Sequence, residues 1–272
     1  MALKLMYISN DVNIAKIAQE NGVDRIFIDL EILGKEERQG HLDTVISRHR
    51  IEDIKKIRPV LNKTKLLVRV NPIYKGSKSE IRTVIECGAD IVMLPFFKSK
   101  SEVQKFIEYI DDRAQSCLLL ETPEAVNCID EILKIDGIDE IHIGLNDLHL
   151  GYKKKFMFEL LADGTVEKIC RKIHEKNIPY GFGGIARLGK GMLPAELVIA
   201  EHYRIGSSMA ILSRSFCNLD NYENLNEAKD IISEGVREIR EYENILKHKD
   251  KGFFENNRLL ILDRVLKIKQ AV

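Results

Sequence analysis

Eight short segments rich in Ile, Val, Leu and Phe recur along the chain, and longer stretches with helical periodicity separate most of them. The eight segments are residues 4–9, 25–30, 65–70, 90–96, 117–121, 140–145, 180–185 and 203–209. Strands that alternate with helices indicate βαβ units and a parallel sheet. Eight such strands are the number that closes a (β/α)8 TIM barrel. We therefore predict an α/β barrel as the catalytic domain, over residues 1–216.

A doubly wound parallel sheet is the alternative fold for such an alternation. Dinucleotide-binding sheets of that class carry a G-x-G-x-x-G motif after the first strand, and the chain has none there. Predicted helices such as 13–22 and 79–88 end at a glycine, which is a common helix C-terminal stop. The barrel is therefore favoured.

Length and composition exclude several functional classes. The chain has 272 residues, of which 44% are hydrophobic, and this is enough for one large core. It has 42 basic and 42 acidic residues, a balance that is not typical of a nucleic-acid binder. No apolar run approaches the roughly 18 residues of a membrane span, and the first residues do not resemble a signal peptide. Five cysteines without a C-x-x-C pair predict reduced thiols and a cytoplasmic protein.

Polar side chains stand at the carboxyl ends of several predicted strands, which is where barrel enzymes carry their active sites. These residues are Asp29, Glu31, Arg69, Glu121, Asn146 and Asp147. Side chains alternate between the two faces of a strand, so Asp29 and Glu31 share one face. We predict that Asp29, Glu31 and Asn146 bind the substrate.

Four carboxylates and one arginine would meet at the mouth of this barrel. Carboxylates that converge repel one another unless some stay protonated or a cation lies between them. Oxygen ligands suit a hard ion such as Mg²⁺ or Mn²⁺. We therefore predict that Glu121 and Asp147 bind a divalent metal and leave open positions for water and substrate. The alternative is an ordinary acid at a helix N-terminus, which fits Asp147 well.

The segment after the second strand, residues 34–50, is long and carries His41 and His49. Long loops in compact domains are often functional, and histidine titrates near neutral pH. We predict His41 as a catalytic acid or base beside Arg69, with a solvated loop histidine as the alternative. His149 is a second candidate.

Two glycines in the seventh segment, Gly183 and Gly184, leave two interpretations open. They allow the backbone to approach an anionic group of a substrate closely, or they relieve crowding at the strand end.

Two motifs resemble the HpcH/HpaI aldolase and citrate lyase β-subunit family. "ETPEA" at 121–125 and "IDGIDEIHIGLNDL" at 135–148 are similar to the family's E-T-x-x-A and GxxD…IGPxDL segments. The resemblance runs from about residue 3 to about residue 216. It implies that Glu121 and Asp147 bind the metal and that Arg69 in "VRVN" is the family's strand-3 arginine. "DLE" at 29–31 is similar to the citrate-lyase-like branch.

The chain departs from the family at the proton-transfer group. Ile32 stands where the aldolases have histidine and where the citrate-lyase-like branch has aspartate, and Leu119 and Leu145 replace a glutamine and a proline. The resemblance implies a metal-dependent carbon–carbon lyase, or aldolase, acting next to the carbonyl of a small 2-oxo acid through an enolate. The alternatives are an acyl-CoA lyase of the citrate or malyl type, and a barrel that has lost catalytic activity and acts as a binding protein.

Residues 217–272 form a predicted C-terminal helical extension. Residues 224–248 have the pattern of one charged amphipathic helix, and 253–268 form a second apolar segment. Because a barrel already has its core, this apolar surface must cover the barrel or a neighbouring subunit. Family aldolases exchange C-terminal helices between subunits, so the resemblance implies a homo-oligomer.

Overall fold

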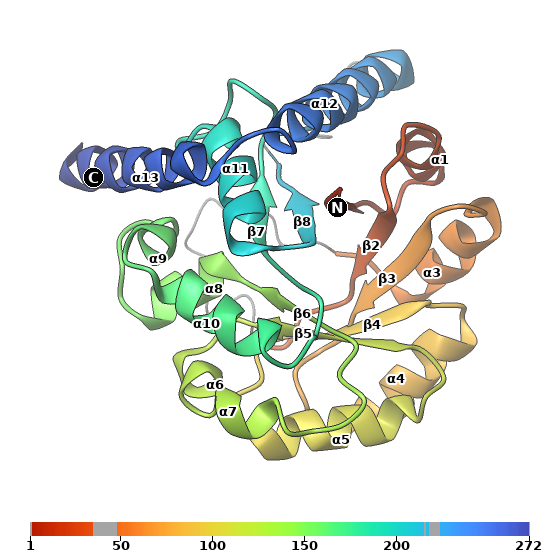
Figure 1. Cartoon of the computed structure of the whole chain (residues 1–272). Coiled ribbons are helices and arrows are strands. Elements are labelled where there is room, and N and C mark those ends of the chain that lie inside the picture. The colour runs from red at the N-terminus through yellow and green to blue at the C-terminus, as the bar shows by residue number, and fades with distance from the viewer. Residues whose placement is uncertain (1, 35–47, 215, 218–223, 272) are drawn as a thin grey trace.

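The computed structural model describes residues 2–34, 48–214, 216–217 and 224–271. Eight parallel strands form a closed barrel in chain order, with β1 paired to both β2 and β8 (Figure 1). The strands are β1 (Lys4–Ile8), β2 (Arg25–Asp29), β3 (Lys65–Arg69), β4 (Ile91–Leu94), β5 (Gln115–Leu120), β6 (Glu140–Ile143), β7 (Tyr180–Ile185) and β8 (Met209–Leu212). The predicted (β/α)8 fold is confirmed.

Helices surround the barrel and cover the outer face of the strands (Figure 1). They are α1 (Val12–Glu20), α3 (Ile51–Ile57), the 3₁₀ helix η1 (Arg58–Val60), α4 (Ser77–Glu86), α5 (Lys100–Ile110), α6 (Pro123–Asn127), α7 (Ile129–Ile132), α8 (Leu145–Gly151), α9 (Glu159–Ala162), α10 (Thr165–His174), α11 (Ala195–Ile205), α12 (Leu225–Leu246) and α13 (Lys251–Ala271).

Each strand is buried on both faces, which is why the strands are almost continuous apolar runs in the sequence. Outward-facing side chains pack against the helices, whereas Phe27, Leu67 and Leu119 belong to a separate cluster inside the barrel. Because side chains alternate along a strand, Asp29 and Arg69 are the next inward positions after Phe27 and Leu67. The barrel geometry therefore directs the polar strand-end residues to its mouth.

A second group of charges lies inside the barrel, at the amino ends of the strands. The two terminal nitrogens of Arg25 on β2, Nη1 and Nη2, donate hydrogen bonds of 2.5 and 2.7 Å to the carboxylate of Glu140 on β6. Both side chains are buried. A buried pair with two matched hydrogen bonds satisfies its own charges, so we interpret it as structural.

The predicted eighth strand, 203–209, is misplaced, because only Met209 of that segment lies in β8. Tyr203 and Ile205 belong to α11, which ends at Ile205 and has Gly206 as its C-cap, and β8 runs from Met209 to Leu212. Aromatic and β-branched residues favour strands in isolation, but tertiary packing can override this preference. Here the Tyr203 hydroxyl donates a hydrogen bond to Glu243 of α12 at 3.1 Å, and Gly206 ends the helix in the left-handed conformation.

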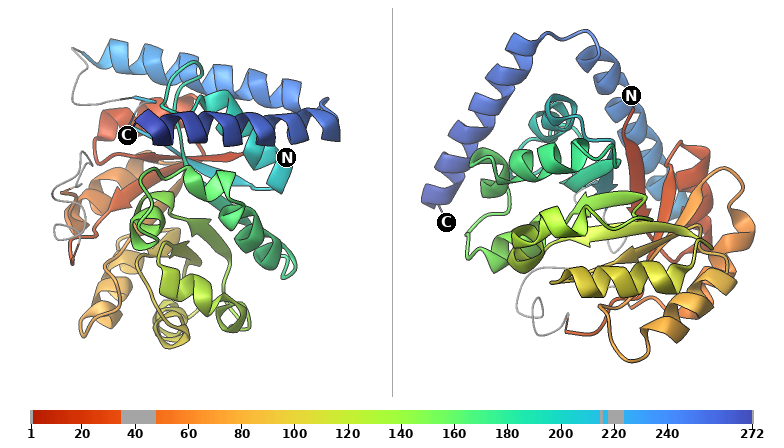
Figure 2. Two further views of the ribbon diagram at one scale, coloured as in Figure 1. Left: turned by 90° about the vertical axis from the view of Figure 1, so that its left-hand side faces the viewer. Right: turned by 60° about the horizontal axis from the view of Figure 1, so that its bottom comes forward.

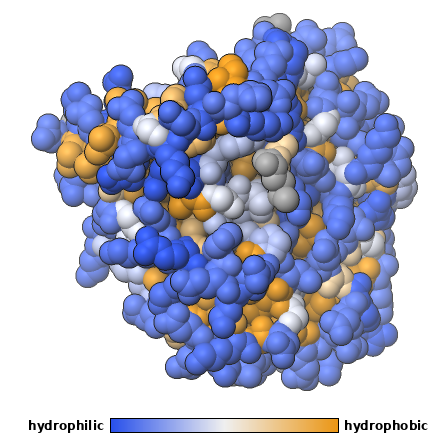
Figure 3. All heavy atoms as spheres, in the orientation of Figure 1, coloured by the Kyte–Doolittle hydropathy of each residue, from blue (hydrophilic) through white to orange (hydrophobic). Residues whose placement is uncertain are grey.

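The two C-terminal helices lie along the outside of the barrel. α12 packs against α1 and α11, and α13 packs against α11 and α9 (Figures 1 and 2). The Asn257 side chain donates to the backbone carbonyl of Leu197, and Ile261 is buried. Hydrophobic residues remain visible on the surface where α13 lies (Figure 3). Within the described ranges, no helix combines the length and apolar character needed to cross a membrane.

Candidate active site

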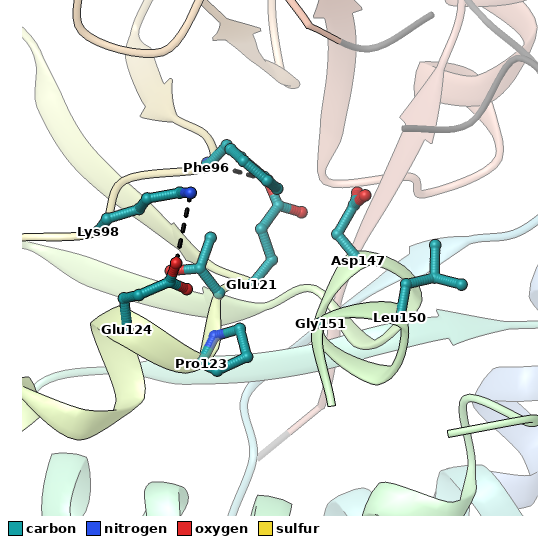
Figure 4. Close-up of a pocket in the computed structure, with 9 residues that line it drawn as sticks. Phe96, Lys98, Glu121, Pro123, Glu124, Asp147, Leu150 and Gly151 are labelled. Carbon is teal, nitrogen blue, oxygen red and sulfur yellow. Dashed lines mark hydrogen bonds and ion pairs between the residues drawn. The ribbon is translucent and has the colours of Figure 1, made fainter. Parts of the chain in front are cut away.

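A pocket of about 430 Å³ lies at the carboxyl ends of the strands, and both predicted metal ligands line it (Figure 4). Its lining residues are Phe96, Lys98, Glu121, Thr122, Pro123, Glu124, Asp147, Leu150 and Gly151. Glu121 follows β5, and Asp147 stands in the first turn of α8. The carboxylates of both residues turn toward the same space in Figure 4. The structure therefore brings together the pair that the sequence predicts.

Backbone geometry fixes the Glu121 carboxylate. Its Oε1 accepts a hydrogen bond of 3.0 Å from the backbone N–H of Phe96, a residue with a positive φ of 48°. On its other side lies Gly144, where a Cβ atom would stand 2.6 Å from Glu121 Oε2. A larger residue at 144 would push the carboxylate away, and this explains the glycine in the "IGLNDL" segment.

The electrostatic environment of Glu121 is unfavourable for a charged carboxylate. Burial raises the pKa of Glu121 well above 4.5, and the charges of Asp147 and Glu31 raise it further, although Arg69 and the Phe96 N–H oppose the shift. A buried carboxyl with carboxylate neighbours holds its proton unless a cation replaces it. The site therefore favours a positive charge at this position.

Arg69 is held in one orientation by Asp29. Its Nε donates to Asp29 Oδ1 at 2.9 Å and its Nη2 to Asp29 Oδ2 at 2.8 Å, while Glu31 lies 3.5 Å from Nε. Burial lowers the pKa of Arg69, but the carboxylates of Asp29 and Glu31 outweigh it and raise the pKa above its ordinary value. The remaining nitrogen, Nη1, makes no hydrogen bond within the described residues. A fixed cation with a spare donor group thus lies close to the carboxylates.

The three predicted substrate-binding residues occupy different environments. Asp29 and Glu31 are each 1% exposed, and the Asp29 carboxylate binds Arg69 with both oxygens. Asn146 is half-buried on α8, and its side chain makes no hydrogen bond in the described part of the chain. Direct contact of these three residues with a substrate remains a prediction.

The three histidines named from the sequence, His41, His49 and His149, differ in their positions. His41 lies outside the described residues. The Nδ1 of His49 accepts a hydrogen bond of 3.0 Å from the Asp29 backbone N–H, and this places an imidazole beside the Asp29–Arg69 pair. His149 is buried, with Nδ1 3.2 Å from the Leu145 carbonyl oxygen. Ile32, at the family's histidine position, is 59% exposed.

His142 on β6 points into the barrel, next to the site. Its Nε2 lies 3.1 Å from the Gly183 carbonyl oxygen, and burial lowers its pKa to about 4. It is therefore neutral at physiological pH and donates from Nε2. Gly183 itself has a φ of 54°, and a Cβ there would stand 2.7 Å from Leu145 Cδ1. The crowding interpretation of this glycine is therefore favoured over anion binding.

Three contacts at the site carry no recognisable sequence signal. One is the Phe96 backbone N–H, because any residue except proline supplies that group. Another is the ion pair of Lys98 and Glu124 on the pocket rim, with Nζ and Oε1 3.3 Å apart. The third is Glu80 on α4, which binds Asn71 behind the site. Lysine and glutamate are common on surfaces, so only their position in the fold distinguishes these residues.

The residues present fit a hard divalent cation. Within the described residues no cluster of three or more His, Cys, Asp or Glu side chains is arranged to hold a metal. The prediction requires only two carboxylates, and Glu121 and Asp147 are oxygen donors whose mutual repulsion a cation would relieve. Glu121 Oε2 also lies in the space that Gly144 leaves open.

Comparison with known proteins identifies the family. The HpcH/HpaI aldolase/citrate lyase family matches residues 4–173, and the chain belongs to this family. The crystal structure of HpcH/HpaI aldolase from Desulfitobacterium hafniense DCB-2 shares the fold, with a TM-score of 0.62 and 16% sequence identity over 88% of this chain and 93% of that one. No curated protein matches the sequence. The resemblance found in the motifs is confirmed, and the family supports a lyase activity.

Proposed function

We propose that this protein is a metal-dependent carbon–carbon lyase that forms or cleaves a bond next to the carbonyl of a 2-oxo acid. One observation carries the proposal: Glu121, whose buried carboxyl is crowded by Asp147 and Glu31, lines a pocket with Asp147 in a member of an aldolase and lyase family. Arg69 supplies a fixed positive charge near this pair.

The chain's own residues have distinct roles in this proposal. Glu121 and Asp147 would hold Mg²⁺ or Mn²⁺, which supplies Lewis acidity toward the substrate's oxygens when bound. Arg69 donates a hydrogen bond to the carbonyl oxygen of the substrate. Negative charge develops on this oxygen while the C–C or C–H bond at the neighbouring carbon breaks. Asp29 positions the guanidinium through its two hydrogen bonds, so no reorientation is needed during the reaction.

The proposed mechanism also requires an acid or base. His41 is our candidate from the sequence. The exposed Ile32 at the family's histidine position favours a second function, a barrel that binds its ligand without turnover. The two functions differ in whether a proton leaves the substrate.

Exchange of the methyl protons of pyruvate with solvent deuterium separates the two functions. We expect exchange in the presence of Mg²⁺ or Mn²⁺ and its loss when a chelator removes the metal, because enolisation needs the developing charge to be stabilised. NMR spectroscopy follows the methyl signal. If pyruvate and the metal bind but no exchange occurs, the lyase proposal fails and the binding function takes its place.

We also propose a homo-oligomer that α13 helps to hold. This helix uses Ile261 and Val265 to cover its own barrel, yet Leu259, Leu260 and Leu266 are 50%, 43% and 51% exposed. Leu259 and Leu266 are seven positions apart and therefore share one face of α13, and a contiguous exposed apolar patch is typical of a surface that a partner covers.

Replacement of Leu259, Leu260 and Leu266 by glutamine tests this assembly without uncovering the barrel. We expect a smaller molecular mass by light scattering and an unchanged circular dichroism spectrum, because the substituted side chains support contacts between subunits. Glu255→Gln with Lys267→Gln, exposed on the same helix, is the matched control and should keep the wild-type mass. An unchanged mass in the triple-leucine variant would refute the proposed interface.

A further inference from the structure

The segment after β2 is held by an unusual set of hydrogen bonds. Beyond Asp29 it has neither helix nor strand structure, yet each backbone N–H from residue 29 to residue 33 has an acceptor. The acceptors are His49 Nδ1 for Asp29, the Arg69 carbonyl oxygen for Leu30, Asp29 Oδ1 for Glu31, and Asn71 Oδ1 for both Ile32 and Leu33. Four of the five N–H groups therefore depend on side chains.

Asn71 provides two of these bonds, and its own orientation depends on Glu80. The Asn71 side chain is buried, and its Oδ1 accepts from the N–H groups of Ile32 and Leu33 at 3.0 Å each. Its Nδ2 donates to Glu80 Oε1 at 2.7 Å, and its backbone N–H lies 3.4 Å from the same oxygen. Because Oε1 accepts from both groups, the amide nitrogen must face Glu80 and the amide oxygen must face the segment.

We infer that Asn71 and Glu80 are positioning residues for the active site. Neither lines the pocket. Together they join α4, the end of β3 and segment 29–33, which carries the two carboxylates that surround Arg69. The inference rests on the proposed function, since the reaction gives the Asp29–Arg69 geometry its importance. Residues behind a site that orient its ligands typically affect activity or metal affinity by about 10- to 100-fold.

An exchange of the two functional groups tests the inference. In Asn71→Asp, the new carboxylate still accepts from Ile32 and Leu33 but lies against the Glu80 carboxylate, and like charges repel. In the double variant Asn71→Asp with Glu80→Gln, the glutamine amide donates to the aspartate and the link is restored with reversed polarity. Glu86→Gln, which removes an exposed charge on the same helix, is the control.

Two readouts separate this inference from the proposed lyase function. Hydrogen–deuterium exchange followed by mass spectrometry should show faster exchange of residues 29–33 in Asn71→Asp, and recovery in the double variant. The kcat for pyruvate proton exchange should fall at least tenfold in Asn71→Asp with little change in KM, and should recover in parallel. The inference is overturned if residues 29–33 of Asn71→Asp take up deuterium as slowly as in wild type, or if the double variant does not restore slow uptake. An unchanged kcat for pyruvate proton exchange in Asn71→Asp also overturns it. If wild-type protein does not enolise pyruvate, the lyase function fails, while deuterium exchange still decides whether Asn71 and Glu80 hold the segment.

Discussion

Arg69→Lys is expected to lower the rate of pyruvate proton exchange by about 10² to 10³, the typical effect of losing one preorganised donor. The guanidinium is aligned by two parallel hydrogen bonds with Asp29, and its Nη1 has no hydrogen-bond partner among the residues that the structure describes. Lysine retains the positive charge but lacks the planar guanidinium group that donates two parallel hydrogen bonds, so it cannot bind Asp29 and the substrate in the same geometry. Since the donor acts mainly where charge develops, kcat should fall more than KM rises.

Thermal unfolding provides the control for this variant. The ammonium of lysine keeps a positive charge beside the buried Asp29, so we expect the fold and the Mn²⁺ affinity to persist. If Arg69→Lys unfolds the protein, Arg69 is chiefly a structural counter-ion for Asp29 and Glu31. If the variant exchanges pyruvate protons as fast as wild type, the oxyanion role belongs to another group.

Glu121→Gln and Asp147→Asn are each expected to abolish Mn²⁺ binding measured by titration calorimetry. Each substitution keeps the shape of the side chain and removes one of the two proposed anionic ligands. Glu124→Gln is the matched control, because Glu124 lines the same pocket but pairs with Lys98 on the rim, and it should bind Mn²⁺ like wild type. If both Glu121→Gln and Asp147→Asn bind Mn²⁺ with wild-type affinity, the metal does not bind at this site.

The dependence of stability on pH gives a second measurement for Glu121. Because its folded-state pKa is raised above 4.5, ionisation of Glu121 destabilises the metal-free protein as pH rises through the folded pKa. In chelator, the melting temperature of Glu121→Gln should therefore match wild type below pH 4.5 and exceed it at higher pH. Mn²⁺ should reverse this order, because it stabilises only protein that binds it. If Glu121→Gln does not melt at a higher temperature than wild type at any pH in chelator, the ionised Glu121 is not repelled by its neighbours.

Hydrophobic patterning made the barrel predictable. A strand buried on both faces must be almost entirely apolar, so its first polar residue marks the carboxyl end and, in a barrel, the mouth. Asp29, Arg69 and Glu121 were located in this way, and the structure places them around one site. The eighth strand was misplaced because Tyr203 and Ile205 have strand-like preferences while packing on α12 places their segment in α11.

The sequence by itself determined the fold class, the family and the identity of the acidic pair, because these depend on local patterns and on motifs within one segment. Only the tertiary structure decided how the charges are arranged. Arg69 binds Asp29 with both nitrogens of its fork, and the Phe96 N–H and Gly144 fix the Glu121 carboxylate from separate strand ends. Such contacts require the distance between segments far apart in the chain to be correct to within a few tenths of an ångström, because hydrogen bonds weaken outside a narrow range of lengths.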